Sequence, residues 1–531
     1  MSDLEIFVDF LKCVLESMSG AEAHRQGCSE RLEQKYQNII NLNKEEDFYK
    51  FLKQEYGDDQ DIYIGLLQYI CEMPYFNERW IEFLRKKLKQ EFEEEDDFFV
   101  ELNLWDQIRS QLFMRGQKLS FLEQWEINER IAGNMAKTFP FAYEKIDKAD
   151  RDNNFVVLFA QTILSTRHAP TRIIVEIARA IQKYLKKRVL IISAVVTTDK
   201  ELLAQREITG YLLNTKMIDH RGAFRAEYKG EYIDAYQIII EKNNALEIKR
   251  LMDEIYGLKP FCVWNLAADP AFSSIAKQWT TSVYTLMNQG YPPVDADYIV
   301  RYLHSDTEKE EEKANKEFLL KKNIKIIETD FMFQYEEPKK NLQRKDFGIP
   351  DSDAFVLGVV GTRLLGECTN EFLEILDRIA ERDKNIFVLF LGFKDEKNIS
   401  KFEKRLQDSM KNLSNYKLMT FKDDIIEYMT FIDLFVNPPR VGGGTCGGMA
   451  LSLGIPAVTL KACDIASVVG ENYTVDTLDE YTELILKYKN DSEFYKCQSK
   501  LAVKRIKEQT MDDEEFASVI QDIFDRIDQG V

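Results

Sequence analysis

The sequence predicts two doubly wound α/β domains preceded by an all-helical leading domain, and three observations predict this fold class. Apolar residues recur at helical spacing through residues 1–148, without a convincing strand pattern. Apolar runs suited to buried strands then alternate with helical patterns over residues 149–306 and again over 347–531, and this alternation is typical of parallel sheets covered by helices. A charged stretch, residues 307–346, connects the two α/β domains.

The leading domain shows only amphipathic helices. Leu4, Phe7, Val8 and Leu11 mark one apolar face at helical spacing. No motif in residues 1–148 carries recognisable chemistry. We therefore interpret this domain as a surface for a partner protein or for the acceptor of a reaction.

Composition argues against several classes of protein. The formal charge of −19 over 531 residues argues against a general nucleic-acid binder, although a local basic cleft for an anionic ligand stays compatible with it. The eight cysteines are scattered without a CxxC pair or a histidine cluster, so we expect neither a zinc site nor a disulfide framework. This use of cysteine is typical of a reducing compartment. The N-terminus is acidic and amphipathic, unlike a signal peptide, and no apolar run is long enough to cross a bilayer. We expect a cytoplasmic protein.

The first α/β domain begins with a nearly continuous apolar run over residues 155–164, which suits a strand buried on both faces. The pattern predicts a helix over about 170–185 and further strands over 188–196 and 261–266. A helical segment is predicted over residues 273–287.

His168 lies between the first strand and the first helix of this domain, two residues before Pro170. Parallel sheets bind ligands where the carboxyl end of a strand meets the N-terminus of the next helix. The positive end of that helix favours a neutral imidazole, which suits a base for an acceptor hydroxyl or a group that orients the transferred sugar. A helix-capping or core histidine is the alternative. Thr171 and Arg172 are secondary candidates on the acceptor or sugar side.

A glycine-rich loop follows the strand predicted over residues 431–436. Its glycines are interrupted only by Thr445 and Cys446, and a helical pattern starts near Met449 and stops at Gly454. A helix N-terminus carries free N–H groups and positive dipole charge, and glycines let an anion approach the backbone closely. The pattern therefore predicts a site for phosphate or pyrophosphate. The five glycines are Gly442, Gly443, Gly444, Gly447 and Gly448.

This loop matches neither of the two commonest nucleotide motifs. A P-loop needs Lys followed by Ser or Thr after its second glycine, and here Gly448 is followed by Met449. The dinucleotide fingerprint can be placed on three of the glycines, but it expects an acidic residue at the end of the next strand, where this chain has Lys461. A turn whose glycines only let a helix pack close to a strand is the third alternative.

The order of motifs in the chain resembles that of the GT-B glycosyltransferases, in which two Rossmann-like domains face each other. The motifs are FGIP at residues 347–350, GTRL at 361–364, NPPRVGGGT at 437–445 and LGIPAVT at 453–459. The resemblance covers about residues 150–505 and is most specific in the second α/β domain.

The loop is most similar to that of the O-linked N-acetylglucosamine transferases and the bacterial protein N-glucosyltransferases. Cys446 stands where this group has a second threonine or a similar residue, and Met449 stands where it has an aspartate for the ribose. Asp464 and Glu471 are the nearest candidates for that ribose contact. The retaining family with two glutamates eight residues apart is a poorer match, because Val441 and Met449 occupy those positions. The matching positions are Gly443, Thr445, Gly447, Gly454, Pro456, Val458 and Thr459.

The resemblance implies a nucleotide-sugar donor, in particular a UDP-sugar, and catalysis without a cofactor or a bound metal. His168 and Arg363 would be the catalytic residues, because a guanidinium group can grip a leaving diphosphate at two points. A salt bridge is the alternative role for Arg363 and for Arg440. The implied donor-binding residues are Gly361, Thr362, Arg363, Lys422, Tyr428, Arg440, Gly442, Gly443, Gly444, Thr445, Cys446, Gly447, Asp464 and Glu471.

Three functions compete at this point. The resemblance favours transfer of a hexose or N-acetylhexosamine to a protein acceptor, with a surface or capsular glycan as the alternative acceptor. The second function is that of a GT-B protein without catalysis, acting as a partner or chaperone of another transferase. The third, a dinucleotide oxidoreductase, is disfavoured by the missing ribose acid.

Overall fold

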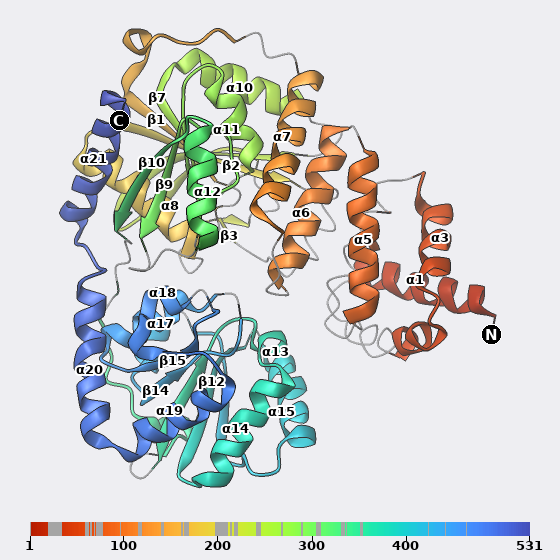
Figure 1. The fold of residues 1–531 in the computed structure, drawn as a ribbon, viewed down its shortest axis with the longest axis vertical. Helices are drawn as coiled ribbons and strands as arrows, with labels where there is room; N and C mark the ends of the chain where they lie inside the picture. The colour runs from red at the N-terminus through yellow and green to blue at the C-terminus, as the bar shows by residue number, and fades with distance from the viewer. Residues whose placement is uncertain are drawn as a thin grey trace.

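The computed structural model shows a leading helical domain and two α/β domains (Figure 1). The described residues are 2–19, 34–58, 63, 66–67, 70, 78–95, 97–114, 119–139, 143–160, 163, 169–196, 211–212, 215–216, 221–240, 246–266, 269–287, 290–303, 310–330, 335, 337–350, 354–393, 395–422, 424–440, 442–463 and 465–530.

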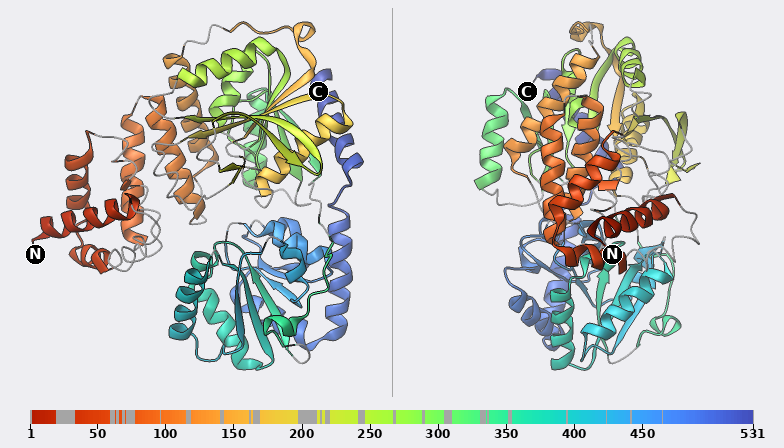
Figure 2. Two further views of the ribbon diagram at one scale, coloured as in Figure 1. Left: turned by 180° about the vertical axis from the view of Figure 1, so that it is seen from behind. Right: turned by 90° about the vertical axis from the view of Figure 1, so that its right-hand side faces the viewer.

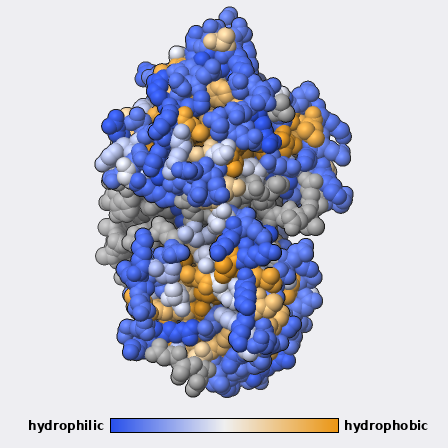
Figure 3. Space-filling view, turned by 90° about the vertical axis from the view of Figure 1, so that its left-hand side faces the viewer, coloured by the Kyte–Doolittle hydropathy of each residue, from blue (hydrophilic) through white to orange (hydrophobic). Residues whose placement is uncertain are grey.

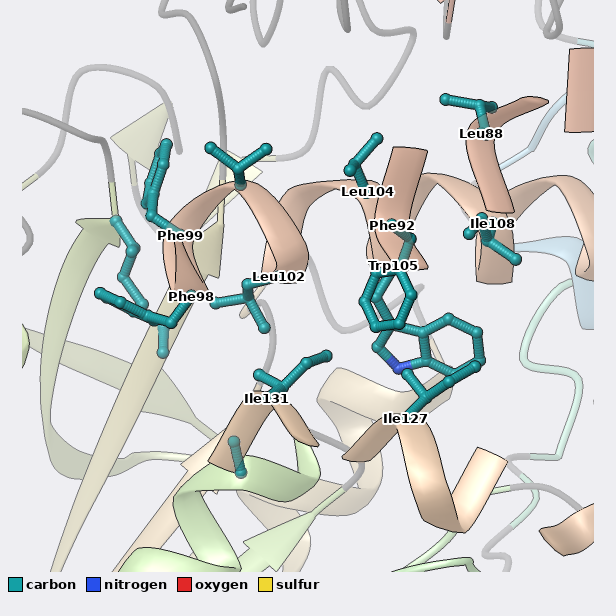
Figure 4. Close-up of a cluster of buried hydrophobic side chains, with 14 of the residues drawn as sticks. Leu88, Phe92, Phe98, Phe99, Leu102, Leu104, Trp105, Ile108, Ile127 and Ile131 are labelled. Carbon is teal, nitrogen blue, oxygen red and sulfur yellow. The ribbon is translucent and has the colours of Figure 1, made fainter. Parts of the chain in front are cut away.

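The leading domain is helical, as predicted. Helices α5, α6 and α7 share a buried cluster in which Trp105 lies among apolar side chains of all three (Figure 4). The start of α7 is fixed by a reciprocal cap between Ser120 and Glu123, which satisfies orphan N–H groups of the first turn. The helices are α1 (Asp3–Ser19), α3 (Glu45–Tyr56), α5 (Glu78–Glu94), α6 (Phe98–Met114) and α7 (Phe121–Thr138).

Polar and aromatic contacts fix this helical domain to the first α/β domain. The indole N–H of Trp105 donates to Asn128 Oδ1 at 3.1 Å, and Asn128 Nδ2 donates to the backbone carbonyl of Pro293 at 2.7 Å. The ring of Trp125 lies 5.1 Å from that of Phe318 on helix α12 (Glu310–Lys321). Because Asn128 and Trp125 are buried and the partly buried Phe318 packs against the same cluster, the two domains are joined by a packed interface.

The first α/β domain contains an eight-stranded sheet in the order β10-β9-β8-β7-β1-β2-β6-β5. All neighbours are parallel except β5, which pairs antiparallel with β6. The chain runs from β1 to β2 on one side and later to β7 on the other, so the topological switch point lies beside β1. The strands are β1 (Asp152–Ala160), β2 (Arg188–Val196), β5 (Gly222–Tyr228), β6 (Glu231–Ile240), β7 (Pro260–Leu266), β8 (Thr281–Thr285), β9 (Tyr298–Leu303) and β10 (Lys325–Asp330); β3 (Tyr211–Leu212) and β4 (Thr215–Lys216) form a separate pair.

One helix predicted for this domain is wrong. The prediction runs over residues 273–287, whereas helix α11 (Pro270–Lys277) ends early and β8 follows it. Asp269 caps α11 by accepting a bond from the backbone of Ala271. The β8 segment, TSVYT, is rich in β-branched and aromatic residues and pairs with β7, which explains the change to a strand. The other helices of this domain are α8 (Ala169–Arg179), continued by a π-helical turn, η2 (Ala180–Tyr184), and α10 (Leu246–Leu258).

The second α/β domain contains a six-stranded parallel sheet in the order β13-β12-β11-β14-β15-β16. Its switch point lies between β11 and β14, from which the glycine-rich loop departs. The strands are β11 (Phe355–Val360), β12 (Ile386–Phe393), β13 (Tyr416–Thr420), β14 (Leu434–Val436), β15 (Ala457–Leu460) and β16 (Thr474–Val475). The helices are α13 (Leu364–Glu367), α14 (Asn370–Arg382), α15 (Glu396–Ser409), α16 (Ile425–Met429), α17 (Gly444–Ser452), α18 (Ile465–Val469), α19 (Leu478–Asn490) and α20 (Ser492–Lys507).

The last helix, α21 (Asp513–Gln529), crosses back to the first α/β domain, as Figures 1 and 2 show. The prediction placed it in the second domain, with residues 347–531. Its apolar face instead joins the core of the first sheet, where the Phe524 ring lies 5.5 Å from Phe261 and 6.1 Å from Trp264. Arg179 donates to Asp513 at 2.6 Å and so fixes the start of the helix.

The two α/β domains form separate lobes with a waist between them, seen in Figure 3 from the side of α20 and α21. None of the helices in the described part of the chain combines the length and the apolar character needed to cross a membrane.

Phe524→Ala tests the crossing of α21. Removing this buried ring should lower the free energy of unfolding of the first α/β domain by about 3–5 kcal/mol. All five tryptophans lie between residues 80 and 279, so the fluorescence change in a urea titration reports on the leading and first α/β domains. Ser518→Ala, on the exposed side of α21, is the matched control and should change stability by less than about 0.5 kcal/mol. Equal effects of the two variants would show that α21 does not belong to this core.

Candidate functional site

Helix α17 begins at Gly444, about five residues before the start that the sequence predicts. Gly443 precedes it with φ 93° and Gly442 with φ 110°, a region that glycine adopts without strain. Gly447 makes the first backbone bond of the helix, donating to the carbonyl of Gly443 at 2.8 Å. The N–H groups of residues 443–446 therefore precede the ladder, and Gly443 has no side chain that could cap them.

The glycines of this segment have two different roles. A Cβ atom on Gly447 would lie 2.6 Å from Ile465 Cδ1, and one on Gly448 would overlap the hydroxyl of Tyr335. The alternative of close packing thus explains these two positions. The contacts at Gly444 and Gly442 are less severe. A Cβ there would lie 3.3 Å from a side-chain atom of Val468 and of Arg363, respectively.

One carboxylate joins two arginines beside this loop. Arg363 ends the turn after β11, and its Nη2 lies 2.7 Å from Glu367 Oε1. Arg440 Nη1 lies 2.6 Å from the other oxygen, Glu367 Oε2. The Arg440 side chain is 4% exposed and that of Arg363 is 35% exposed. Arg440 is thus enclosed, whereas Arg363 is partly exposed to solvent next to Gly442.

The contacts of Arg440 assign it to holding the loop, in place of the phosphate contact expected from the sequence. Its Nε donates to Asn437 Oδ1 at 2.8 Å and its Nη2 donates to the carbonyl of Val360 at 2.7 Å. Together with Glu367, these partners connect the end of β11, the start of the loop and α13. Gly361 makes room for the guanidinium group, because a Cβ there would overlap Nη1.

Arg172 is a residue of the first α/β domain that lies within electrostatic range of this site. It stands in the first turn of α8, and its charge acts on Cys446 in the first turn of α17. Burial raises the pKa of the Cys446 thiol, and the guanidinium groups of Arg440 and Arg172 oppose that rise. Thr171, the other candidate on α8, is fully buried, so it is enclosed in the helix packing.

Lys422 and Tyr428 lie together at the β13–α16 connection. The Lys422 ammonium group lies 5.7 Å from the centre of the Tyr428 ring, which packs edge-on against Phe347 at 5.3 Å. Thr362 is exposed beside Arg363. Lys422 and Tyr428, both implied donor-binding residues, are therefore neighbours in the structure.

Other candidates are placed elsewhere or not described. Glu471 is exposed in a short 3-10 helix, η6 (Glu471–Tyr473), where its charge acts on Lys461 and its carbonyl accepts a bond from Thr474. His168 and Asp464 lie outside the described residues, as does Val441. Within the described ranges, no three His, Cys, Asp or Glu side chains gather as a metal-binding group would.

Sequence reasoning missed three residues of this site, namely Glu367, Asn437 and Tyr335. The spacing of Arg363 and Glu367, four apart, is a usable signal for an ion pair on a helical turn. Asn437 and Tyr335 have no such signal, because their contacts are with residues distant in the chain.

Comparison with known proteins decides the fold. No family model and no curated protein sequence matches the chain. Its structure is similar to that of a mutant O-GlcNAc transferase of Thermobaculum terrenum, with a TM-score of 0.56 and 13% sequence identity, over 99% of this chain and 98% of the other. The chain has the GT-B fold. Because the similarity spans the whole chain, it includes the helical leading domain; at this identity it shows the fold alone.

Two further solved structures match over about seven tenths of this chain. Sucrose-phosphate synthase of Thermosynechococcus elongatus has a TM-score of 0.49 and 10% identity, over 71% of this chain and 100% of the other. Anabaena Alr3699/HepE, in complex with UDP and glucose, has a TM-score of 0.45 and 12% identity, over 70% and 99%.

Arg440→Met and Arg363→Met should separate the two arginines by stability. Loss of the enclosed Arg440 breaks a buried ion pair and two further bonds, so unfolding followed by circular dichroism should show a loss of about 3–5 kcal/mol. Arg363→Met removes a part-exposed pair and should cost less than about 1 kcal/mol. A similar loss in both variants would contradict the structural role of Arg440.

Proposed function

We propose that this GT-B chain is a glycosyltransferase that moves a sugar from a UDP-sugar to an acceptor. One observation carries the proposal. The glycine-rich start of α17 lies at the switch point of the second sheet, with Arg363 beside Gly442 and with Arg172 of the first α/β domain within electrostatic range of Cys446. A helix N-terminus between cationic side chains is suited to the paired phosphates of a nucleotide sugar.

The chemistry assigns these groups to the leaving diphosphate. When the bond between the anomeric carbon and the β-phosphate oxygen breaks, negative charge grows on that oxygen and must be stabilised. The N–H groups of residues 443–446, the Thr445 hydroxyl and the Arg363 guanidinium group would donate to it. The acceptor oxygen or nitrogen forms the new bond to the anomeric carbon and gives up its proton, for which the sequence nominates His168. No metal or cofactor is required in this proposal, because fixed dipoles and arginines carry the charge.

The remaining donor contacts follow from the border of the second domain. Lys422 and Tyr428 would face the base, since Lys422 follows the carboxyl end of β13 and lies over the Tyr428 ring of α16. Asp464 stays a proposed ribose contact on sequence grounds, and Glu471 is less suited because its described neighbours are Lys461 and Thr474.

A protein is the acceptor that we favour. The packed helical domain extends the first α/β domain with additional surface, and α6 and α7 lie against that domain (Figure 2). A surface or capsular glycan is the alternative acceptor, and a hexose and an N-acetylhexosamine are both compatible with the donor site. Incubation with a panel of UDP-sugars and candidate acceptors, followed by mass spectrometry, distinguishes them: a glycan product without a glycopeptide would reject the protein acceptor.

UDP titration by calorimetry tests the donor site. The wild-type chain should bind UDP, and Arg363→Met and Thr445→Val should each weaken binding by about tenfold or more, since each loses a donor to charged phosphate oxygens. Arg378→Met is the matched control, because Arg378 forms a surface pair with Asp479 on α14 and α19; its affinity for UDP should be unchanged.

His168→Ala should retain UDP affinity and lose about 10²-fold or more in turnover if it is the base. Absence of UDP binding by the wild-type chain at millimolar nucleotide would reject the donor site and favour a non-catalytic partner. Wild-type turnover in His168→Ala would restrict this histidine to a structural role.

A further inference from the structure

Tyr335 stands where the chain passes from the first α/β domain to the second. Strand β10 of the first sheet ends five residues before it, at Asp330. After it, the connector is fastened to the second domain: the backbone N–H groups of Lys339 and Lys340 donate to the buried carboxylate of Glu427 at 2.7 and 2.8 Å. Arg344 further along pairs with an aspartate of the second domain at 2.8 Å. Tyr335 thus lies between a strand of the first α/β domain and a segment bonded to the second.

The ring of Tyr335 contacts both α/β domains. It packs against the core of the first sheet and against that of the second. Its edge rests directly on α17, because a Cβ on Gly448 would overlap the hydroxyl oxygen and would lie 3.0 Å from Cε1. The hydroxyl oxygen itself is buried. Gly448 is therefore required by this ring, independently of any ligand.

Two groups of the candidate site surround the same ring. Burial raises the pKa of Tyr335, the charge of Arg172 opposes that rise and Cys446 adds to it. Arg172 belongs to the first domain and Cys446 to the first turn of α17, so both lie within electrostatic range of the phenol. One side chain of the connector thus meets both halves of the site.

We propose that Tyr335 is a positioning residue that sets the distance between Arg172 and the first turn of α17. The inference rests on the proposed function, since that distance matters when a diphosphate lies between the two. The Tyr335 ring is partly buried and packs against both cores, and a close-packed ring fixes the separation of the surfaces on either side. In this proposal the N–H groups of α17 and Arg363, both of the second domain, supply the ground-state affinity for UDP, whereas Arg172 acts on the negative charge that grows on the diphosphate as the sugar is transferred. Tyr335 should therefore influence turnover and leave UDP affinity unaltered.

Three variants test this proposal by their coupling. In Tyr335→Ala, kcat with a UDP-sugar should fall by about tenfold or more while the Kd for UDP changes less than about twofold. Gly448→Ala should have the same effect, because its Cβ displaces the ring. The double variant should be no worse than Tyr335→Ala, since the partner of the clash is gone.

Tyr335→Phe keeps the ring and should recover most of the turnover. Gly257→Ala, which meets nothing within 4 Å, is the matched control.

The outcomes separate failure of this proposal from failure of the proposed function. Wild-type kcat in Tyr335→Ala, or additive losses in the double variant, would overturn the positioning role. If the wild-type chain binds no UDP, the proposed function fails. The placement of the Tyr335 ring is then tested by alkylating Cys446 with iodoacetamide and measuring the reaction by peptide mass spectrometry. Tyr335→Ala should then raise the rate at Cys446 several-fold relative to exposed Cys497, and an unchanged ratio would refute the placement of the ring.

Discussion

The first turn of α17 depends on one enclosed guanidinium group, that of Arg440. It bonds to the carbonyl at the end of β11, to Asn437 at the end of β14 and to Glu367 on α13. Since β11 and β14 are neighbours at the switch point, this group fixes the loop against the sheet edge from which the helix departs. Glu367 then holds the more exposed Arg363 next to Gly442. Arg440, which is enclosed, thus positions Arg363, whose side chain is partly exposed and accessible to a ligand.

The arrangement of the two lobes depends on chain crossings as well as on surface contact. The connector passes from β10 to Tyr335 and is then bound to Glu427 of the second domain. The C-terminal segment returns through α21, whose apolar face is part of the first core. Two crossings restrict the relative motion of the lobes more than one linker would. Arg172, on the first lobe, lies within electrostatic range of Cys446 in the first turn of α17 on the second.

Sequence patterns predicted the elements and the glycine-rich turn before a helix because both depend on local chemistry: apolar runs between turns, and glycines before a helix. They failed where tertiary packing decided. Glycines are poor helix formers, yet residues 444–448 are helical because α18 and Tyr335 pack against them. The same limitation applies to Arg440, for which the sequence left an anion contact and a salt bridge open, and to α21, whose amphipathic pattern reveals an apolar face without its destination. Glycine content also could not show how closely each glycine is packed: a Cβ would lie 2.6 Å from Ile465 at Gly447 and 3.3 Å from Val468 at Gly444.

The central claim is that backbone N–H groups at the start of α17 hold the diphosphate of a UDP-sugar. A crystal structure of the chain with UDP tests it most directly. The account predicts β-phosphate oxygens about 2.7–3.2 Å from backbone nitrogens within residues 443–446, with Arg363 turned from Glu367 toward them. UDP bound away from this turn, or phosphates held by side chains elsewhere on the two lobes, would contradict it.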